Sequence, residues 1–310
     1  MARASRRPRP RRRILLLAGF ALILALLTVD YFAYPYGRYL TGRSFNRGQN
    51  GLWLRYTWYF GEQPPGAVQR LAERLRSDQI AFAYFHVRSL KPDGSLEFRY
   101  PSAAQLTRTI REAKIKAIAW VYVPATVRLT DPVVRAKAVD QARWLTGQCG
   151  FDGVQWDYEP CPSGDPGFLD LLDATRSALP NSLISVAAPV WYPWPLGRYG
   201  WLPDYFRQVE SRCDQIAVMG YDTGFFTPRS YEWLIAQQPS HIPRVASCRV
   251  LMGLPTYIRG GRSHNPRAEN LKLALKGVRD SAGVDGVALF ADYTTDSVDW
   301  NWYRQAWLSR

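Results

Sequence analysis

Short runs of β-branched and aromatic residues alternate with amphipathic stretches of helical length from residue 51 onward. The intervening stretches often begin on Ser, Asp or Pro, residues that favour helix N-termini. Eight apolar runs read as buried strands, at 52–60, 79–87, 115–123, 152–159, 183–191, 214–222, 250–257 and 285–293. Eight such units predict an α/β fold, a closed (β/α)8 TIM barrel. An open doubly wound sheet is the alternative, but YFGEQPPG is not its glycine-rich first turn.

The first 50 residues follow a different pattern. Seven arginines and no acidic residue fall in residues 1–13, and an uncharged apolar stretch then runs from Ile14 to Val29. Tyr31, Phe32 and Tyr34 occupy the zone where a cleaved signal peptide would carry small residues. We therefore expect a single-pass membrane anchor, with cleavage after export as the alternative.

This pattern divides the chain into four parts. Because positive charge stays on the cytoplasmic side, the long C-terminal part should lie outside the cytoplasm. We expect a basic cytoplasmic tail at 1–13, the anchor at 14–34, a linker at 35–50 and the barrel at 51–310.

The net charge of +14 suggests a nucleic-acid partner until its position is considered. The N-terminal arginines account for half of it, and the remaining +7 is scattered over residues 14–310 without a basic stripe. We therefore expect no nucleic-acid partner. The 12 Trp and 18 Tyr suit either a surface that stacks on sugars or an aromatic-rich core. Nothing in the sequence indicates the oligomeric state.

Four cysteines permit disulfides in an exported domain. Cys213 and Cys248 precede the sixth and seventh predicted strands, which are barrel neighbours, so they should lie at one rim within disulfide reach. Cys149 and Cys161 flank the fourth strand at opposite ends and cannot pair. Four free thiols are the alternative. The absence of a C-x-x-C pair and the presence of only three His argue against a zinc site.

Polar residues gather where the predicted strands end, which is the face of such barrels that carries chemistry. The fourth strand offers three of them in FDGVQWDYEP, residues 151–160. Side chains alternate along a strand, so Gln155, Asp157 and Glu159 should face the lumen, and Trp156 and Tyr158 the outer helices. Candidate binding residues at the ends of other strands are Tyr221, Asp222, Tyr257 and Asp292.

Two neighbouring carboxylates repel when both are ionised, which raises the pKa of at least one and keeps a proton near neutral pH. This arrangement predicts Glu159 as a general acid supported by Asp157. Two other interpretations stay open. The polar groups could be structural, although burying them unpaired is costly, or Asp157, Glu159, Asp222 and Asp292 could bind a metal ion.

The fourth strand resembles the signature of glycoside hydrolase family 18, the chitinase-like hydrolases, which reads D-x-x-D-x-D-x-E. Here DGVQWDYE, from Asp152 to Glu159, matches three of the four acidic positions. Other segments resemble further strands of this family in the same order, namely FAYFHVRSLKPDGSLEF, VMGYD, VLMGLPTY and DGVALFADYTTD. The resemblance implies the same barrel and a polysaccharide or oligosaccharide substrate.

The family's chemistry carries over to the matching positions. The resemblance implies that Glu159 protonates the glycosidic oxygen while Asp157 orients the N-acetyl group of the substrate, whose carbonyl oxygen attacks the anomeric carbon. Tyr221 would hydrogen-bond the same group, and Met219 and Asp222 would shape the site. No cofactor and no metal are implied.

Three positions depart from the family pattern. Gln155 replaces the inner aspartate, so we expect it to hydrogen-bond Asp157 without accepting its proton. The third strand, AIAWVYVP, lacks the small residue and two glycines that end it in the family, and Phe290 replaces a Trp at the floor of the sugar site. A barrel that binds a glycan or wall polymer without cutting it is therefore the alternative function. An anchored glycosyltransferase would need a D-x-D turn in a loop, which WDYE is not.

Overall fold

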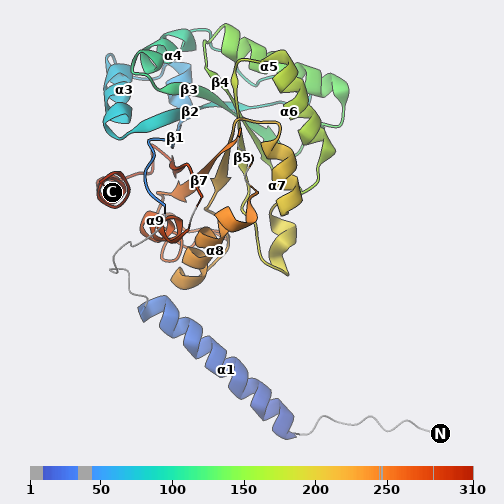
Figure 1. The fold of residues 1–310 in the computed structure, drawn as a ribbon, viewed down its shortest axis with the longest axis vertical. Coiled ribbons are helices and arrows are strands. Elements are labelled where there is room, and N and C mark those ends of the chain that lie inside the picture. Colours follow the sequence, from blue (N-terminus) through green and yellow to red (C-terminus); the bar gives the residue numbers. More distant parts are fainter. Residues whose placement is uncertain (1–9, 34–43, 244, 246, 282, 310) are drawn as a thin grey trace, which may run out of the picture.

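The computed structural model describes residues 10–33, 44–243, 245, 247–281 and 283–309. Eight strands form a closed barrel in chain order, and each is parallel to its neighbours, including the first to the last (Figure 1). The predicted (β/α)8 barrel is confirmed. The strands are β1 Asn50–Leu54, β2 Ile80–Ser89, β3 Lys116–Pro124, β4 Gly153–Glu159, β5 Leu183–Ala188, β6 Gln215–Met219, β7 Arg249–Pro255 and β8 Gly286–Phe290.

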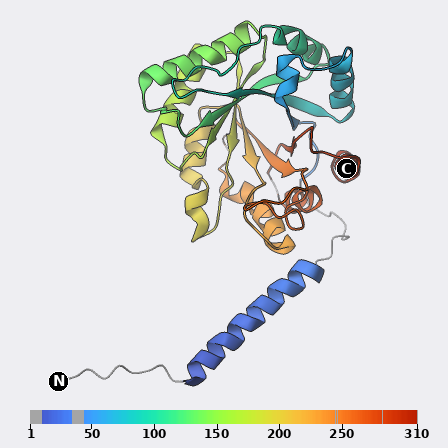
Figure 2. The same ribbon diagram turned by 180° about the vertical axis from the view of Figure 1, so that it is seen from behind.

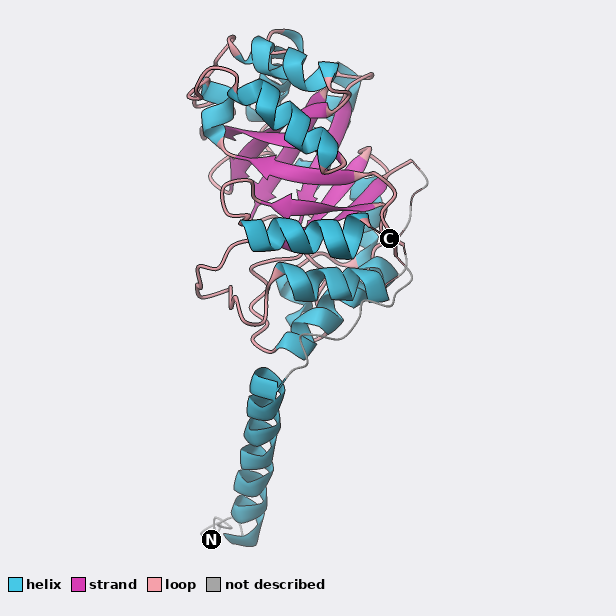
Figure 3. Ribbon diagram, turned by 90° about the vertical axis from the view of Figure 1, so that its left-hand side faces the viewer, coloured by secondary structure: helices cyan, strands magenta, loops and turns pink. Residues whose placement is uncertain are grey.

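Helices cover the outside of the barrel, as the views from behind and from the side show (Figures 2 and 3). Local chemistry starts several of them. The side chains of Asp131 and Asp165 accept backbone N–H groups, with a proline directly following each. The covering helices are α3 Ala67–Ser77, α4 Ala103–Glu112, α5 Pro132–Gly147, α6 Pro166–Ala178, α7 Pro203–Glu210, α8 Pro228–His241, α9 Leu271–Asp280 and α10 Ser297–Tyr303, followed by the short π-helix η2 Arg304–Leu308.

The first predicted strand, at 52–60, extends beyond the strand that the structure has. β1 ends at Leu54, and residues 56–60 form a short helix, α2 Tyr56–Phe60, closed by Gly61 in the left-handed region. The aromatic residues of 56–60 suggested a strand, but here they fold over the rim, where Tyr59 is buried and Trp58 donates a hydrogen bond to Asp292. Asn50, placed in the predicted linker, is the first residue of β1.

A helix also forms over the predicted anchor. α1, Pro10–Ala33, projects from the barrel and contacts it at α8 (Figure 1). Its described apolar side chains are exposed, Leu15 by 72%. Among the residues described, however, no helix is both long enough and apolar enough to span a bilayer, so the anchor is not confirmed. Most of the predicted tail and linker lies outside the described residues.

Cys213 and Cys248 lie together, as the strand order predicted. Both side chains are buried at the start of β6 and β7, and their Sγ atoms are 3.7 Å apart. Both are free thiols here, as are Cys149 and Cys161. The Sγ of Cys149 instead approaches the carbonyl oxygen of Tyr100, 3.4 Å away.

We predict that Cys213 and Cys248 form a disulfide in an oxidising compartment. Closing the chain between them should stabilise the fold by about 4 kcal/mol, which corresponds to about 10 °C in Tm. Tm with and without reductant, together with a disulfide map, measures this. The difference in Tm with and without reductant should persist in Cys149→Ser and disappear in Cys213→Ser. A Cys149–Cys161 bond in the map, or a Tm that reductant leaves unchanged in the exported protein, would contradict the prediction.

Candidate active site

The alternation along β4 sorts its side chains into two environments. Trp156 and Tyr158 point to the outer layer, where Trp156 donates to Thr175 of α6 and Tyr158 packs against Phe168 of the same helix. Gln155 and Asp157 are buried in the lumen, and Glu159 is half-buried at its mouth. The strand therefore places its polar face inside the barrel.

Gln155 belongs to a hydrogen-bonded network across the lower lumen. Trp53 of β1 donates its indole N–H to Gln155 Oε1 at 2.7 Å, and Gln155 Nε2 donates to Ser185 Oγ at 3.1 Å. Ser185 and Tyr84 both donate to Gln215 Oε1. Because both ends of its amide are engaged with other strands, Gln155 does not hydrogen-bond Asp157, and that expectation is wrong.

Asp157 is held by a tryptophan instead. Trp120 of β3 donates its indole N–H to Asp157 Oδ2 at 2.7 Å. Oδ1 is buried and has no hydrogen-bond partner among the described residues. Burial raises the pKa of Asp157 well above its ordinary value, and the charge of Glu159 raises it further, while the Trp120 bond acts in the opposite direction. Asp157 therefore combines a fixed orientation with one oxygen left for another donor.

Glu159 is also predisposed to keep a proton. Burial raises its pKa, and the charge of Asp222 adds to this, while its interaction with Asp157 lowers it. Glu159 raises the pKa of Asp157, whereas Asp157 lowers that of Glu159, so the two carboxyls titrate as one coupled pair. The arrangement can hold a proton at the barrel mouth and deliver it to a bound molecule.

Two cavities flank Glu159. One, of about 320 Å³, extends toward Tyr122 and Cys161, and the other, of about 220 Å³, extends toward Tyr221 and Asp222. The two share four residues, Glu159, Pro189, Met219 and Tyr199. Tyr199 belongs to the short 3-10 helix η1, Leu196–Tyr199, in the loop after β5. A ligand in both cavities would cross directly over the Glu159 carboxyl.

Aromatic side chains form the wall of the lumen beside Asp157. Tyr221 stacks on Phe290, with ring centroids 4.7 Å apart, and meets Trp53 and Tyr257 edge-on. Burial raises the pKa of Tyr221 well above its ordinary value, and the charges of Asp157 and Glu159 raise it further, so its hydroxyl stays a hydrogen-bond donor. Tyr221 thus adds a neutral donor beside the two carboxyls.

Only some of the predicted binding residues line the two cavities beside Glu159. Met219, Tyr221 and Asp222 line them, whereas Tyr257 and Phe290 pack behind Tyr221 and Gln155 lies deeper in the barrel. Asp292 lies toward β1, where its oxygens accept from the Arg55 backbone N–H at 3.2 Å and from the Trp58 indole at 2.9 Å. The alternative metal site of Asp157, Glu159, Asp222 and Asp292 is therefore not formed.

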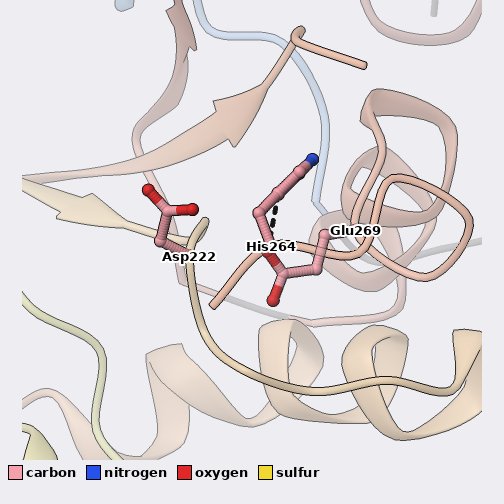
Figure 4. A group of neighbouring side chains, drawn as sticks. All are labelled: Asp222, His264 and Glu269. Carbon is pink, nitrogen blue, oxygen red and sulfur yellow. Dashed lines mark hydrogen bonds and ion pairs between the residues drawn. The ribbon is translucent and has the colours of Figure 1, made fainter. Parts of the chain in front are cut away.

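A different group of potential metal ligands includes Asp222. Ligand atoms of Asp222, His264 and Glu269 lie within 4.8 Å of one another, and the interaction drawn in Figure 4 joins His264 to Glu269. His264 Nδ1 lies 2.9 Å from Glu269 Oε2, and its Nε2 lies 3.1 Å from the Tyr257 carbonyl. Glu269 Oε1 accepts from the backbone and hydroxyl of Thr223. With both ring nitrogens engaged, the group connects two loops and needs no ion.

The sequence interpretation missed the indoles that position the polar face. Trp53 and Trp120 contact Gln155 and Asp157 from strands far away in sequence, so no motif around β4 contains them. His86 of β2 stacks on Trp120 with ring centroids 4.2 Å apart, and burial lowers its pKa to about 4, which keeps it neutral. The available signal was Trp120 in AIAWVYVP, the third-strand segment whose ending departs from the family pattern.

Comparisons with solved structures agree with this architecture. The spore cortex-lytic enzyme SleL of Bacillus cereus matches with a TM-score of 0.61 and 12% identity, over 86% of this chain and 75% of that one. A chitinase from Chromobacterium violaceum matches at 0.58 and 16%, over 84% and 99%. A chitinase from Bacteroides thetaiotaomicron matches at 0.56 and 16%, over 83% and 93%.

At these identities the likeness establishes the fold. No family model matches the sequence, and no curated protein has detectable similarity to it. The resemblance to family 18 barrels is therefore confirmed at the level of the barrel, and the chemistry must be argued from the site.

Proposed function

Starting from the barrel that this chain shares with chitinases of glycoside hydrolase family 18, we propose that it hydrolyses glycans containing β-linked N-acetylhexosamine. One observation carries the proposal. Asp157 and Glu159 stand on the lumen face of β4 with raised pKa values, and Glu159 lines both of the cavities that flank it. A carboxyl with a raised pKa between two cavities is suited to protonating the bridging oxygen.

The reaction needs one acid and one internal nucleophile. Glu159 donates its proton to the glycosidic oxygen as the bond to the anomeric carbon breaks. Asp157 accepts the N–H of the acetamido group and directs its carbonyl oxygen to that carbon, which forms an oxazolinium intermediate. Glu159 then takes a proton from water as the water opens the intermediate, so two displacements retain the β configuration.

The side chains around the pair support these roles. The Trp120 bond fixes the Asp157 carboxyl by Oδ2, which leaves Oδ1 for the substrate N–H. Tyr221 lines the same cavity as Glu159, and its hydroxyl could donate to the acetamido oxygen and so orient it toward the anomeric carbon. Met219 offers an apolar surface beside the leaving sugar.

Binding without hydrolysis is the second candidate. It is favoured by Gln155, which cannot cycle a proton with Asp157, and by Phe290, which lacks an indole donor. The two candidates differ in whether Glu159 needs a proton, because a binding site gains nothing from a buried acid.

A product assay separates them. Incubated with β-linked N-acetylglucosamine oligomers across pH 4 to 8, the chain should release shorter oligomers. The same oligomers without N-acetyl groups should remain intact, because they carry no internal nucleophile. Binding of the acetylated oligomers with no product after hours would establish the binding barrel in place of the enzyme.

We also propose that residues 14–34 hold the chain at a membrane with the barrel on the extracytoplasmic side. Seven arginines precede Ile14, and the described apolar side chains of α1 are exposed. The full-length protein should sediment with membranes and resist protease added from the cytoplasmic side, and a chain lacking residues 1–40 should be soluble and folded. Recovery of a mature chain that starts between residues 28 and 45 would contradict this prediction.

A further inference from the structure

A third groove, of about 580 Å³, lies between the loop after β6 and the loop after β7. Residues 224–226 form one wall and residues 260–266 form the other. Both loops follow the carboxyl ends of their strands, so the groove opens on the same face of the barrel as Glu159. Neither wall takes part in the hydrolysis described above.

This groove lies next to the cavity beside Tyr221, with one aromatic contact between their walls. Phe225, on the groove wall, stacks on Tyr192 with ring centroids 6.2 Å apart and an interplanar angle of 18°. Tyr192 lines the cavity next to Glu159 and donates its hydroxyl to the Thr223 carbonyl at 3.0 Å. A polymer that passes over Glu159 toward Asp222 therefore meets the groove next.

The groove is held open without a ligand. The Gly224 N–H donates to the Ser263 carbonyl at 2.8 Å, which joins the two walls directly. Beneath them, buried Glu269 accepts from Thr223 on one loop and contacts His264 on the other (Figure 4). Binding here would require little reordering of the backbone.

The far wall of the groove is positively charged. Arg262 lines it and Arg259 directly precedes the lining glycines, and both side chains are exposed. Neither has an ion-pair partner among the described residues, and the nearby carboxylate of Glu269 is already engaged by Thr223 and His264. A neutral chain of N-acetylglucosamine offers these arginines only hydroxyl and amide oxygens, whereas a carboxylate forms stronger, charge-assisted hydrogen bonds of defined geometry.

We propose that this groove binds the extension of the glycan beyond the Tyr221 cavity and selects chains whose sugars carry carboxylates. The proposal rests on the proposed function and names its substrate class, a β-linked N-acetylhexosamine polymer with acidic substituents. A 3-O-lactyl ether on alternate sugars is the simplest chemistry of this kind.

The test compares two sets of oligomers of equal length, one of plain N-acetylglucosamine and one with a 3-O-lactyl group on alternate sugars. At low salt we expect kcat/KM to be about tenfold higher for the acidic set. Arg262→Gln should lower the acidic-to-neutral ratio about five- to tenfold, since it removes a charged hydrogen bond. Salt at 0.5 M should lower the ratio similarly.

Arg249→Gln is the matched control, because this exposed arginine begins β7 at the opposite end of the barrel. It should leave the ratio unchanged. A wild-type ratio near one, or equal losses in Arg249→Gln and Arg262→Gln, would overturn the proposal. If neither set is cleaved, the proposed hydrolysis fails, and equilibrium binding of both sets to the wild type and Arg262→Gln decides the groove separately.

Discussion

Glu159→Gln should lower the hydrolysis of N-acetylated oligomers by roughly 10²- to 10⁴-fold, the usual range for losing a general acid. The amide is close in size and shape to the carboxyl, so the fold and the affinity for substrate should persist. The loss should therefore appear in kcat, with KM changed much less. Initial rates on wild type and variant, with circular dichroism for the fold, measure this.

Glu73→Gln provides the matched control. Glu73 is exposed on α3, outside the barrel mouth, and its replacement should leave the rate unchanged. An active Glu159→Gln variant would remove Glu159 from the acid role, and the mechanism would then need another proton donor at the mouth.

Asp157→Asn should be nearly as damaging to activity and should stabilise the fold at high pH. If the Asn oxygen accepts the Trp120 indole N–H, the NH₂ group takes the place of the carboxylate oxygen that Trp120 leaves free. An NH₂ group cannot accept the acetamido N–H, so the acetamido oxygen is poorly oriented for attack. We expect roughly a 10²- to 10³-fold loss in kcat. The Asn Oδ1 can still accept the Trp120 indole N–H, which preserves the packing.

The stability effect has a definite sign. Because the pKa of Asp157 is raised in the folded state, that state binds more protons than the unfolded chain, and wild-type stability falls as pH rises from about 4 through the folded pKa. Asn does not titrate, so the Tm of the variant minus that of wild type should grow with pH over this window. Asp204→Asn, at an exposed position on α7, should show no such trend. A Tm difference that shrinks with pH would contradict the raised pKa.

The barrel was predictable because its determinants are local. Each strand is a short apolar run followed by a capped amphipathic helix, and repetition of this unit leaves few topologies. The outward Trp156 and the inward Asp157 follow from the two-residue period of β4. Where the local pattern was ambiguous, as in the aromatic run at 56–60, tertiary packing decided in favour of a helix.

The hydrogen-bond network inside the site was not predictable in the same way. Whether Gln155 faces Asp157 or turns to Trp53 and Ser185 depends on which donors other strands bring into the lumen, and those lie 102 and 30 residues away in sequence. The groove beside Arg262 depends on two loops that have no periodic pattern. Both features arise from barrel closure.

The hydrogen bonds of Gln155 also affect how Asp157 and Glu159 titrate. Because Gln155 replaces a carboxyl and its amide is hydrogen-bonded to Trp53 and Ser185, no carboxyl lies below Asp157 on β4 to accept its proton. The proton is therefore shared by the two carboxyls, and Trp120 is the donor that orients Asp157.

The anomeric form of the first product tests the central claim most directly. Proton NMR, recorded within minutes of adding enzyme to N-acetylglucosamine oligomers, resolves the α and β signals before mutarotation mixes them. Attack by the acetamido oxygen followed by water predicts that the new reducing end appears as the β anomer. Initial formation of the α anomer would show a single displacement by water and would contradict substrate-assisted catalysis at Asp157 and Glu159.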